Sequence, residues 1–347
     1  VDHDGKTIEY TCSFLFCCSG YYDYDQGYSP EFPGVADFKG TVVHPQHWPE
    51  DLDYTGKNVV VIGSGATAVT LIPSLVNGGV GHVTMLQRSP TYIGSLPLED
   101  PIALRTNKYL PKNLAHFVNR WKQIGYSTGQ YQVARNFPSL FKKVLRRMAE
   151  RRLPEGFDYD KHFSPRYNPW DERVCLAPNG DLFKAIRSGK AGVVTDTIET
   201  FTETGIKLTS GEELQADIIV TATGLNIQLF GGMSLSVDGT AVDLTDTVAY
   251  KGIMLSGVPN FAFAFGYTNS SWTLKVGLLC EHFCRLLKHM DDNGFDAVQP
   301  EFTGSQTRPL LDFAAGYVQR SIDEIPRQGV DGPWQMTMNY TLDAETL

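Results

Sequence analysis

The sequence predicts an α/β protein organised around parallel β-strands, and three observations support this fold class. Residues Asn58–Ile62 form a short apolar, β-branched run, which is typical of a strand buried on both faces. A G-x-G-x-x-A motif (Gly63, Gly65, Ala68) follows and leads into small and apolar residues at helical spacing. The length of 347 residues is enough for two hydrophobic cores, so we expect two domains.

The glycine motif predicts a dinucleotide-binding site. Gly63 permits a tight turn, Gly65 lets a pyrophosphate approach the backbone, and Ala68 lets the helix pack closely on the strand. The helix N-terminus then faces the anion. An ordinary strand–turn–helix unit is the alternative. The residues expected to contact the cofactor are Gly63, Ser64, Gly65, Ala66, Thr67 and Ala68.

The next strand indicates which dinucleotide binds. His82–Leu86 is followed by Gln87, Arg88 and Ser89, and no carboxylate occurs from His82 to Leu98. An NAD site usually places Asp or Glu here for the ribose 2′-hydroxyl, whereas a 2′-phosphate favours a guanidinium. We therefore expect NADPH, with Arg88 and Ser89 at its 2′-phosphate. The alternative is that Arg88 only solvates the strand end.

Composition excludes several classes of function. The net charge of −9 and the pI near 5.4 argue against nucleic acid or an anionic membrane surface as partner. No apolar run approaches the roughly 18 residues of a membrane span. The six cysteines form neither a zinc-type pair nor a disulfide framework, which favours reduced thiols in a cytoplasmic protein without a metal site.

A second motif lies just before the first. Phe38-x-Gly40-x-x-x-His44-x-x-x-Trp48-Pro49 resembles the fingerprint of the Baeyer–Villiger monooxygenases, whereas the related flavin-containing monooxygenases usually carry another aromatic at the position of Trp48. A buried structural role is the alternative for His44. The resemblance covers essentially the whole chain. It implies FAD and NADPH as cofactors, O₂ as co-substrate, and a small ketone, aldehyde or sulfur-containing substrate. Trp48 is among the residues expected to contact a cofactor.

The resemblance also implies an arrangement of domains. We expect two Rossmann-like dinucleotide-binding domains, the NADPH domain being inserted into the FAD domain and carrying a helical insert at about 100–165. The boundaries expected are 1–49 for the end of the first FAD segment with the fingerprint, 50–190 for the NADPH domain, 191–222 for strands returning to the junction, and 223–347 for the second FAD segment.

The first residues suggest that a segment is missing. Thr7–Tyr10 has a hairpin-like pattern and Ser13–Cys18 reads as a strand ended by Ser19 and Gly20. By resemblance, Ser19 and Gly20 close over the FAD, and an FAD-binding βαβ unit with its own glycine motif precedes them. No such motif occurs in this sequence. We therefore expect an N-terminally truncated fragment.

The predicted insert is basic and amphipathic. Phe137, Leu140, Phe141, Val144 and Leu145 form an apolar stripe at helical spacing. The basic cluster at 142–152 fits a solvated helix face better than a nucleic-acid site in a protein this acidic. By resemblance, such an insert walls the substrate pocket.

The segment Pro165–Leu176 contains Arg173, which falls where the family has its active-site arginine. The resemblance assigns Arg173 and His44 to the catalytic machinery, Arg173 holding an anionic oxygen beside the nicotinamide. A guanidinium suits this role because it stays charged at any working pH. An ordinary salt bridge to Asp171 or Glu172 is the alternative.

The C-terminal part predicts further cofactor contacts. Ala216–Gly224 reads as a buried strand ending in Ala-Thr-Gly, a motif that in two-dinucleotide flavoproteins marks the crossing between domains and so places Thr223 and Gly224 near cofactor. Phe261–Phe265 is expected to be a strand, followed by a polar turn with Thr268 and Asn269 and a helix to about Met290. That turn and helix start would face the flavin. No clear element is expected before Leu347.

These inferences converge on an FAD- and NADPH-dependent monooxygenase of Baeyer–Villiger type, which converts ketones or aldehydes to esters or lactones and oxygenates sulfur or thioamides. Two alternatives stay open: an N- or S-oxygenating flavin monooxygenase, and an inactive NADPH-binding fragment. The substrate and the oligomeric state are not encoded in any motif found here.

Overall fold

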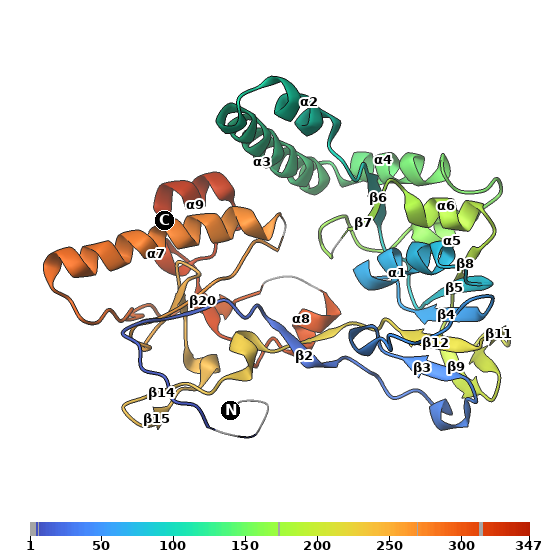
Figure 1. Ribbon diagram of the computed structural model, residues 1–347, viewed down its shortest axis with the longest axis horizontal. Helices are drawn as coiled ribbons and strands as arrows, with labels where there is room; N and C mark the ends of the chain where they lie inside the picture. Colours follow the sequence, from blue (N-terminus) through green and yellow to red (C-terminus); the bar gives the residue numbers. More distant parts are fainter. Residues whose placement is uncertain (1–4, 6, 173, 269, 312–314) are drawn as a thin grey trace. The chain divides into compact units, whose positions relative to one another are not determined.

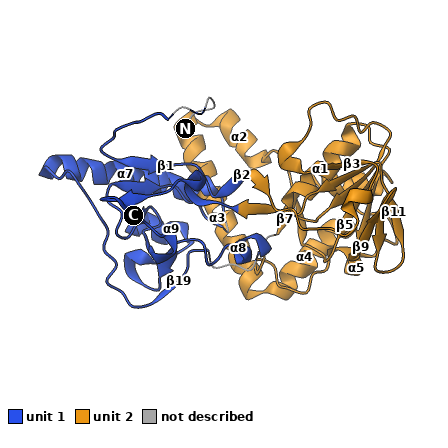
Figure 2. Cartoon of the chain, turned by 90° about the horizontal axis from the view of Figure 1, so that it is seen from below, with its two compact units in different colours: residues 1–23, 227–347 blue, residues 24–226 orange. Residues whose placement is uncertain are grey.

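The computed structural model describes residues 5, 7–172, 174–268, 270–311 and 315–347. The chain forms two compact units, and each is described here by itself: unit 1 comprises 1–23 and 227–347, and unit 2 comprises 24–226 (Figure 2). The chain passes between the units in the segments β2 (Tyr22–Gly27) and β13 (Leu225–Ile227). Among the described helices, none is both long and apolar enough to span a bilayer.

Unit 2 is built on a five-stranded parallel sheet with the order β3-β12-β4-β5-β8. The strands are rich in valine and isoleucine, as expected of a parallel sheet covered on both faces. Their bounds are β3 (Thr41–Val43), β12 (Ile218–Thr221), β4 (Asn58–Ile62), β5 (His82–Gln87) and β8 (Ala191–Thr195). The predicted strands at 58–62 and 82–86 are confirmed.

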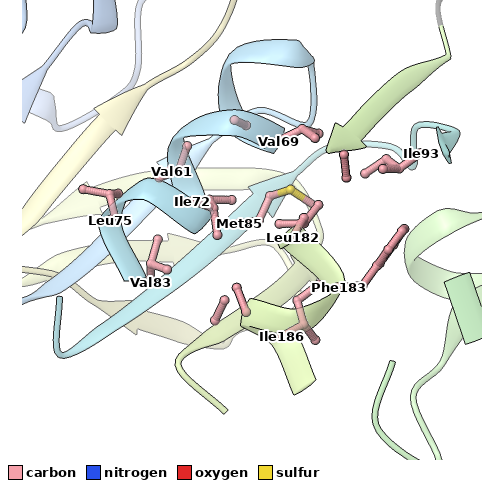
Figure 3. Close-up of a cluster of buried hydrophobic side chains, with 14 of the residues drawn as sticks. Val61, Val69, Ile72, Leu75, Val83, Met85, Ile93, Leu182, Phe183 and Ile186 are labelled. Carbon is pink, nitrogen blue, oxygen red and sulfur yellow. The ribbon is translucent and has the colours of Figure 1, made fainter. Parts of the chain in front are cut away.

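Two helices cover one face of this sheet, α1 (Ala66–Asn77) and α6 (Asp181–Arg187). Figure 3 shows this core, in which strand residues such as Val61 and Met85 point toward Ile72 of α1 and Leu182 of α6. On the opposite face, the apolar side chains of Val60, Ile62, Leu86 and Ile219 pack with those of the antiparallel sheet β9 (Ile198–Thr202), β10 (Gly205–Leu208) and β11 (Glu213–Gln215). Unit 2 therefore has three layers: the helices α1 and α6, the parallel sheet, and the antiparallel sheet.

The predicted helical insert is present in unit 2 (Figure 1). It consists of β6 (Ile93–Leu96), α2 (Pro101–Tyr109), α3 (Lys112–Asn136), α4 (Pro138–Glu150), α5 (Tyr159–Phe163) and β7 (Cys175–Pro178), which pairs parallel with β6. Only two of the five residues of the predicted apolar stripe are buried. Phe141 and Leu145 pack in a cluster with Tyr92, whereas Leu140 and Val144 are exposed.

Unit 1 contains a four-stranded sheet with the order β1-β18-β17-β16. Its strands are β1 (Leu15–Cys17), β18 (Phe261–Phe263), β17 (Met254–Leu255) and β16 (Ala249–Tyr250); the pair β1–β18 is parallel and the other pairs are antiparallel. Helix α7 (Trp272–Asn293) contributes Leu279 and Phe283 to the core around β18, and α9 (Tyr340–Thr346) contacts α7. The predicted strand and long helix are confirmed, with the strand ending at Phe263 and the helix at Asn293.

Short elements complete the two units. They are α8 (Gly316–Arg320), the strand pairs β14 (Ser236–Val237) with β15 (Thr240–Ala241) and β19 (Thr307–Pro309) with β20 (Arg327–Gly329), and the 3₁₀ helices η1 (Val35–Asp37), η2 (Pro45–His47), η3 (Leu229–Gly232), η4 (Leu244–Asp246) and η5 (Gly332–Trp334).

Two expectations about the ends of the chain are wrong. Residues 7–12 form no strand and are exposed, because the alternating pattern there meets no partner strand among the described residues. Near Leu347 the chain forms α9, where Asn339 caps the helix by accepting from the backbone N–H groups of Thr341 and Leu342. The functional domain boundaries at 49/50, 190/191 and 222/223 stay predictions; the compact units divide at 23/24 and 226/227.

Candidate dinucleotide-binding site

Four parallel strands of unit 2 end at one edge of the sheet, and the predicted site residues follow them. Ile62 of β4 pairs with Leu86 of β5 on one side and with Thr221 of β12 on the other. In turn, Val220 pairs with Val43 of β3. The fingerprint histidine, the Ala-Thr-Gly motif, the glycine motif and Arg88 thus leave the sheet from adjacent strands. In parallel α/β sheets this carboxyl edge is where ligands bind.

Gly63 is required by a close backbone approach. Its N–H donates to the carbonyl of Leu86 at 2.8 Å, and its φ is +130°. A Cβ at this position would lie 2.3 Å from the carbonyl oxygen of Ala222, which follows β12. No side chain fits such a space, and L-residues rarely adopt this conformation.

Gly65 faces open space instead. A Cβ built at Gly65 would have no heavy atom within 4 Å. Gly65 is the N-cap of α1, and no side chain caps this helix, so its first N–H groups point toward the opening. Ala68 is fully buried against the sheet. The turn therefore leaves room for an anion such as a pyrophosphate at the start of α1.

Arg88 directly follows β5, and the register places Leu86 of this strand beside Ile62, the last residue before Gly63. Arg88 and Ser89 are both exposed. Within the described part of the chain, the guanidinium of Arg88 forms no ion pair. A cation without a protein partner at this place fits a phosphate on the 2′ position of a ribose.

The fingerprint segment joins β3 to the rest of the sheet. Phe38 is buried with its ring edge against Phe201. Gly40 is required by close packing, since a Cβ there would lie 2.4 Å from the carbonyl oxygen of Asp217, just before β12. Trp48 is half-buried and packs edge-to-face on Tyr54. Part of the fingerprint thus serves to dock β3 on β12.

His44 comes directly after β3 and its ring is poorly partnered. Its Nδ1 accepts from the backbone N–H of Gln46 at 3.3 Å. Its Nε2 is buried and forms no regular hydrogen bond with any described residue. Burial lowers the pKa of His44; the backbone of Gly224 opposes this shift and His47 adds to it. Burial thus favours the neutral form of the His44 ring, which packs against the backbone of Gly27.

Thr223 and Gly224 are held beside this edge by Tyr28. The hydroxyl of Thr223 donates to the carbonyl of Tyr28 at 2.6 Å, and the N–H of Tyr28 donates to the carbonyl of Gly224 at 3.0 Å. These contacts hold the turn after β12 next to Gly63. The predicted placement of Thr223 and Gly224 near a cofactor stays a prediction.

The segment leading to Arg173 also reaches the glycine motif; Arg173 itself lies outside the described residues. Ser64 Oγ and Thr91 Oγ1 are hydrogen-bonded at 2.7 Å, and the hydroxyl of Tyr92 donates to the carbonyl of Tyr167 at 3.1 Å. Burial, assisted by Asp171, raises the pKa of Tyr92 to about 12. Tyr92 is therefore in a water-poor environment, whereas Ser64 and Thr91 are partly exposed.

One partner suggested for Arg173 is already engaged. Asp171 forms an ion pair with Arg135 at 2.5 Å and accepts from the backbone N–H of Asn168. Glu172 is half-buried, and burial together with Asp171 raises its pKa. The salt bridge from Arg173 to Asp171 or Glu172 stays an open alternative, because Arg173 lies outside the described residues.

The remaining predicted cofactor contacts belong to unit 1. Ser19 Oγ lies 3.3 Å from Cys17 Sγ, and Gly20 has a φ of +78°. Thr268 Oγ1 lies 3.9 Å from Met338 Sδ, just before the N-cap residue Ser271 of α7. Asn269 lies outside the described residues. The roles of these residues at a flavin stay predictions.

Comparison with known proteins decides the family. A model described as flavin-binding monooxygenase-like matches residues 1–100. The FAD-containing monooxygenase EthA of Mycolicibacterium smegmatis is 69% identical over 345 residues, which is 99% of this chain and 70% of that protein. This chain belongs to the flavin-binding monooxygenase-like family. Two further members are EthA of Mycobacterium tuberculosis H37Rv, 58% identical over 99% of this chain and 71% of its own length, and the probable FAD-binding monooxygenase AlmA of Acinetobacter baylyi, 49% identical over 99% and 69%.

Solved structures of flavoprotein monooxygenases share the fold. An oxidized steroid monooxygenase bound to NADP superposes with a TM-score of 0.64 at 20% identity, over 83% of this chain and 63% of that chain. OTEMO in complex with FAD and NADP gives a TM-score of 0.61 at 22% identity, over 83% and 64%. The chain thus spans less than two thirds of these structures. They confirm the predicted α/β fold class.

The sequence analysis did not predict some residues near the site of this flavin-binding monooxygenase-like protein. Gln87 is buried, and its Nε2 donates to the carbonyl of His162 and to Thr195 Oγ1. His162 Nδ1 lies 2.8 Å from the same threonine oxygen. These hydrogen bonds connect α5, through His162, to Gln87 at the end of β5 and to Thr195 at the end of β8. No motif marks these residues, because their contacts join positions 75 and 108 residues apart.

Proposed function

We propose that this chain forms the NADPH-binding part and one flavin-facing part of an FAD- and NADPH-dependent Baeyer–Villiger monooxygenase. The reaction proposed inserts one oxygen atom of O₂ into a ketone or aldehyde to give an ester or lactone, and it extends to sulfur and thioamide groups. The observation that carries the proposal is the sheet edge. There β12 joins the fingerprint strand β3 to the glycine-motif strand β4.

The residues at this edge fit NADPH. The uncapped start of α1 and the open space over Gly65 would receive the pyrophosphate. Arg88 and Ser89 would receive the 2′-phosphate. His44 leaves β3 at the same edge, and the proposal places it near the nicotinamide end of the cofactor. The solved monooxygenases bound to NADP are consistent with this role.

The fit to FAD is partial within the described residues. Helix α7 is 22 residues long, and its N-cap residue Ser271 makes no side-chain cap, so its first N–H groups suit the ring oxygens of a flavin. No second strand–turn–helix cradle like that at Gly63 occurs in the described part of unit 1. When bound, FAD would supply the activation of O₂ and the oxygen transfer. The chain's own contribution is to bind, orient and exclude water.

None of the six cysteines forms a disulfide within the described residues, which supports a reducing compartment such as the cytoplasm. O₂ and a small carbonyl or sulfur compound are the partners expected of the proposed reaction. An N- or S-oxygenating monooxygenase is the second candidate. Supplying the purified full-length protein with NADPH and either a ketone or a tertiary amine distinguishes the two, since Baeyer–Villiger activity yields an ester from the ketone. A protein that binds NADPH but shows no flavin absorbance would instead be a nucleotide-binding module.

Replacing Arg88 with alanine is expected to weaken NADPH binding by about 1–3 kcal/mol, or about 5- to 150-fold in Kd, because a charge-assisted contact to the 2′-phosphate is lost. Binding of NADH should hardly change. Arg187→Ala, which removes an exposed arginine from the end of α6, serves as the control. Calorimetric titration with both nucleotides measures the effect, and equal losses for NADPH and NADH would refute the assignment of Arg88.

Replacing Arg173 with alanine in the full-length protein is expected to abolish ester formation while FAD and NADPH still bind. The physical reason is the loss of the cation that holds an anionic oxygen in a water-poor pocket. NADPH oxidation would then continue with release of H₂O₂ in place of ester, as measured by chromatography and a peroxide assay. Arg166→Ala in the same segment is the control. Ester formation at the native rate by Arg173→Ala would exclude the proposed role.

A further inference from the structure

The helical insert of unit 2 carries charge of the opposite sign to the whole chain. Residues 101–152 contain twelve lysines and arginines and a single carboxylate, Glu150, whereas the chain has a net charge of −9. The segments outside the insert are therefore strongly acidic. Overall composition conceals this asymmetry, which concentrates positive charge on α2, α3 and α4.

The same helices expose large apolar side chains. On α2 and the first half of α3, Tyr109 is 73% exposed, Phe117 58% and Trp121 48%. Ile102 and Leu114 are also more than 45% exposed. We call these five residues the hairpin patch. Soluble surfaces rarely group so many large apolar side chains, and such groupings mark interaction sites.

Helical geometry places the α3 members of the hairpin patch on one face. Leu114, Phe117 and Trp121 follow the i, i+3, i+7 spacing, and the rings of Phe117 and Trp121 lie 6.3 Å apart. The face of α3 opposite to these three residues contacts α2. There the side chain of Asn119 accepts a hydrogen bond from Thr106 Oγ1 at 2.9 Å. The apolar stripe is thus not used to join the two helices. Figure 1 shows α4 between this hairpin and the sheet of unit 2.

Cations lie beside the hairpin patch. Arg105, Lys108 and Lys112 are exposed and, within the described residues, form no ion pair. The ammonium of Lys108 lies 5.3 Å from the ring centroid of Tyr109. Exposed aromatic and aliphatic side chains mixed with uncompensated basic residues are the composition of helices that lie in a membrane interface.

We propose that the α2–α3 hairpin docks on an anionic membrane surface, with the hairpin patch inserted among the lipid headgroups and Arg105, Lys108 and Lys112 at the phosphates. The charge pattern favours an anionic membrane as the partner of this surface. Two copies of the chain meeting through this face would bring two basic regions together, whereas an anionic bilayer complements both the charge and the apolar side chains. This revises the expectation drawn from net charge alone.

Vesicle binding tests the proposal. The full-length protein is mixed with vesicles of phosphatidylcholine alone, or of phosphatidylcholine and phosphatidylglycerol in equal parts, and binding is measured by co-sedimentation at low and high salt. We expect binding to the anionic vesicles only, weakened by salt. The variant R105E/K108E/K112E should bind about 100-fold more weakly, since each basic residue near such a surface contributes about a five-fold gain.

Two further variants separate the proposal from trivial effects. K184E/R187E/K190E makes the same charge change on exposed residues of α6 and the following loop, and it should bind like the native protein. Trp121→Phe should remove most of the blue shift in tryptophan emission that vesicles induce. Circular dichroism confirms that each variant is folded.

Three outcomes would overturn the proposal. The first is an absence of binding by the native protein. The second is equal binding by the two triple variants. The third concerns the variants Phe117→Ser and Trp121→Ser. If they change the oligomeric state in light scattering but leave vesicle binding intact, the hairpin patch contacts a second copy of the chain.

Discussion

Replacing Gly63 with alanine should destabilise unit 2 by about 2–5 kcal/mol, whereas the same change at Gly65 should leave its stability nearly unchanged. At Gly63 a Cβ would lie 2.3 Å from the backbone oxygen of Ala222, in a conformation with a φ of +130°. The strained backbone costs about 1–3 kcal/mol and the overpacking a similar amount. At Gly65 φ is −76° and no atom lies within 4 Å of the added methyl.

The two variants should separate on a second measurement. Gly65→Ala places a methyl group in the cradle above α1, so NADPH affinity should fall about ten-fold or more while the melting curve of the protein stays near that of the native chain. Thermal unfolding and nucleotide titration of both variants measure this difference. If Gly65→Ala binds NADPH with native affinity, the pyrophosphate does not pass over this turn.

Replacing Asp343 with asparagine should destabilise the α7–α9 region of unit 1 by about 3–5 kcal/mol at neutral pH, because it strips the partner from a buried lysine. Lys275 Nζ lies 2.7 Å from Asp343 Oδ2, and both side chains are at most 5% exposed. Tyr267 donates to Asp343 Oδ2 at 2.6 Å and Thr337 to Oδ1 at 2.7 Å. Hydrogen exchange of the α7 and α9 amides measures the loss.

The destabilisation should depend on pH with a definite sign. Burial lowers the pKa of Lys275, and Asp343 opposes this shift. Without the carboxylate the folded chain binds this proton less readily than the unfolded chain, whose lysines titrate near about 10.4. Stability of the variant should therefore rise with pH from 7 toward 10. Glu345→Gln, on the exposed side of α9, should change neither stability nor its pH dependence. Loss of the same size in both variants would show that the ion pair is not the cause.

The parts of the fold that depend on nearby residues could be predicted. Strand β4, the turn at Gly63 and helix α1 follow one another in sequence, so apolar runs and glycine spacing were sufficient to find them. The helices of the insert were also predicted from periodicity. Periodicity did not show that Phe141 is buried while Leu140 is exposed, because that depends on packing against β6 and Tyr92.

Contacts between distant positions could not be predicted. The buried pair Lys275–Asp343 joins positions 68 residues apart in α7 and α9, and α9 itself was not expected. In the site, nothing in the fingerprint shows that Gly40 is required by the carbonyl of Asp217. Motif spacing thus located the site, whereas the reasons for several of its residues appear only in three dimensions.

The strand order of unit 2 also constrains how the protein acquires its structure during synthesis. β12 lies between β3 and β4, although it is made more than 150 residues after them. Until the ribosome has passed residue 221, β3 has no neighbour in this sheet and β4 keeps one open edge. An unpaired apolar edge invites association between chains. Nascent chains stalled before β12 should therefore require chaperone protection, and its insertion, which seats Ala222 against Gly63, becomes the closing step in forming the nucleotide site.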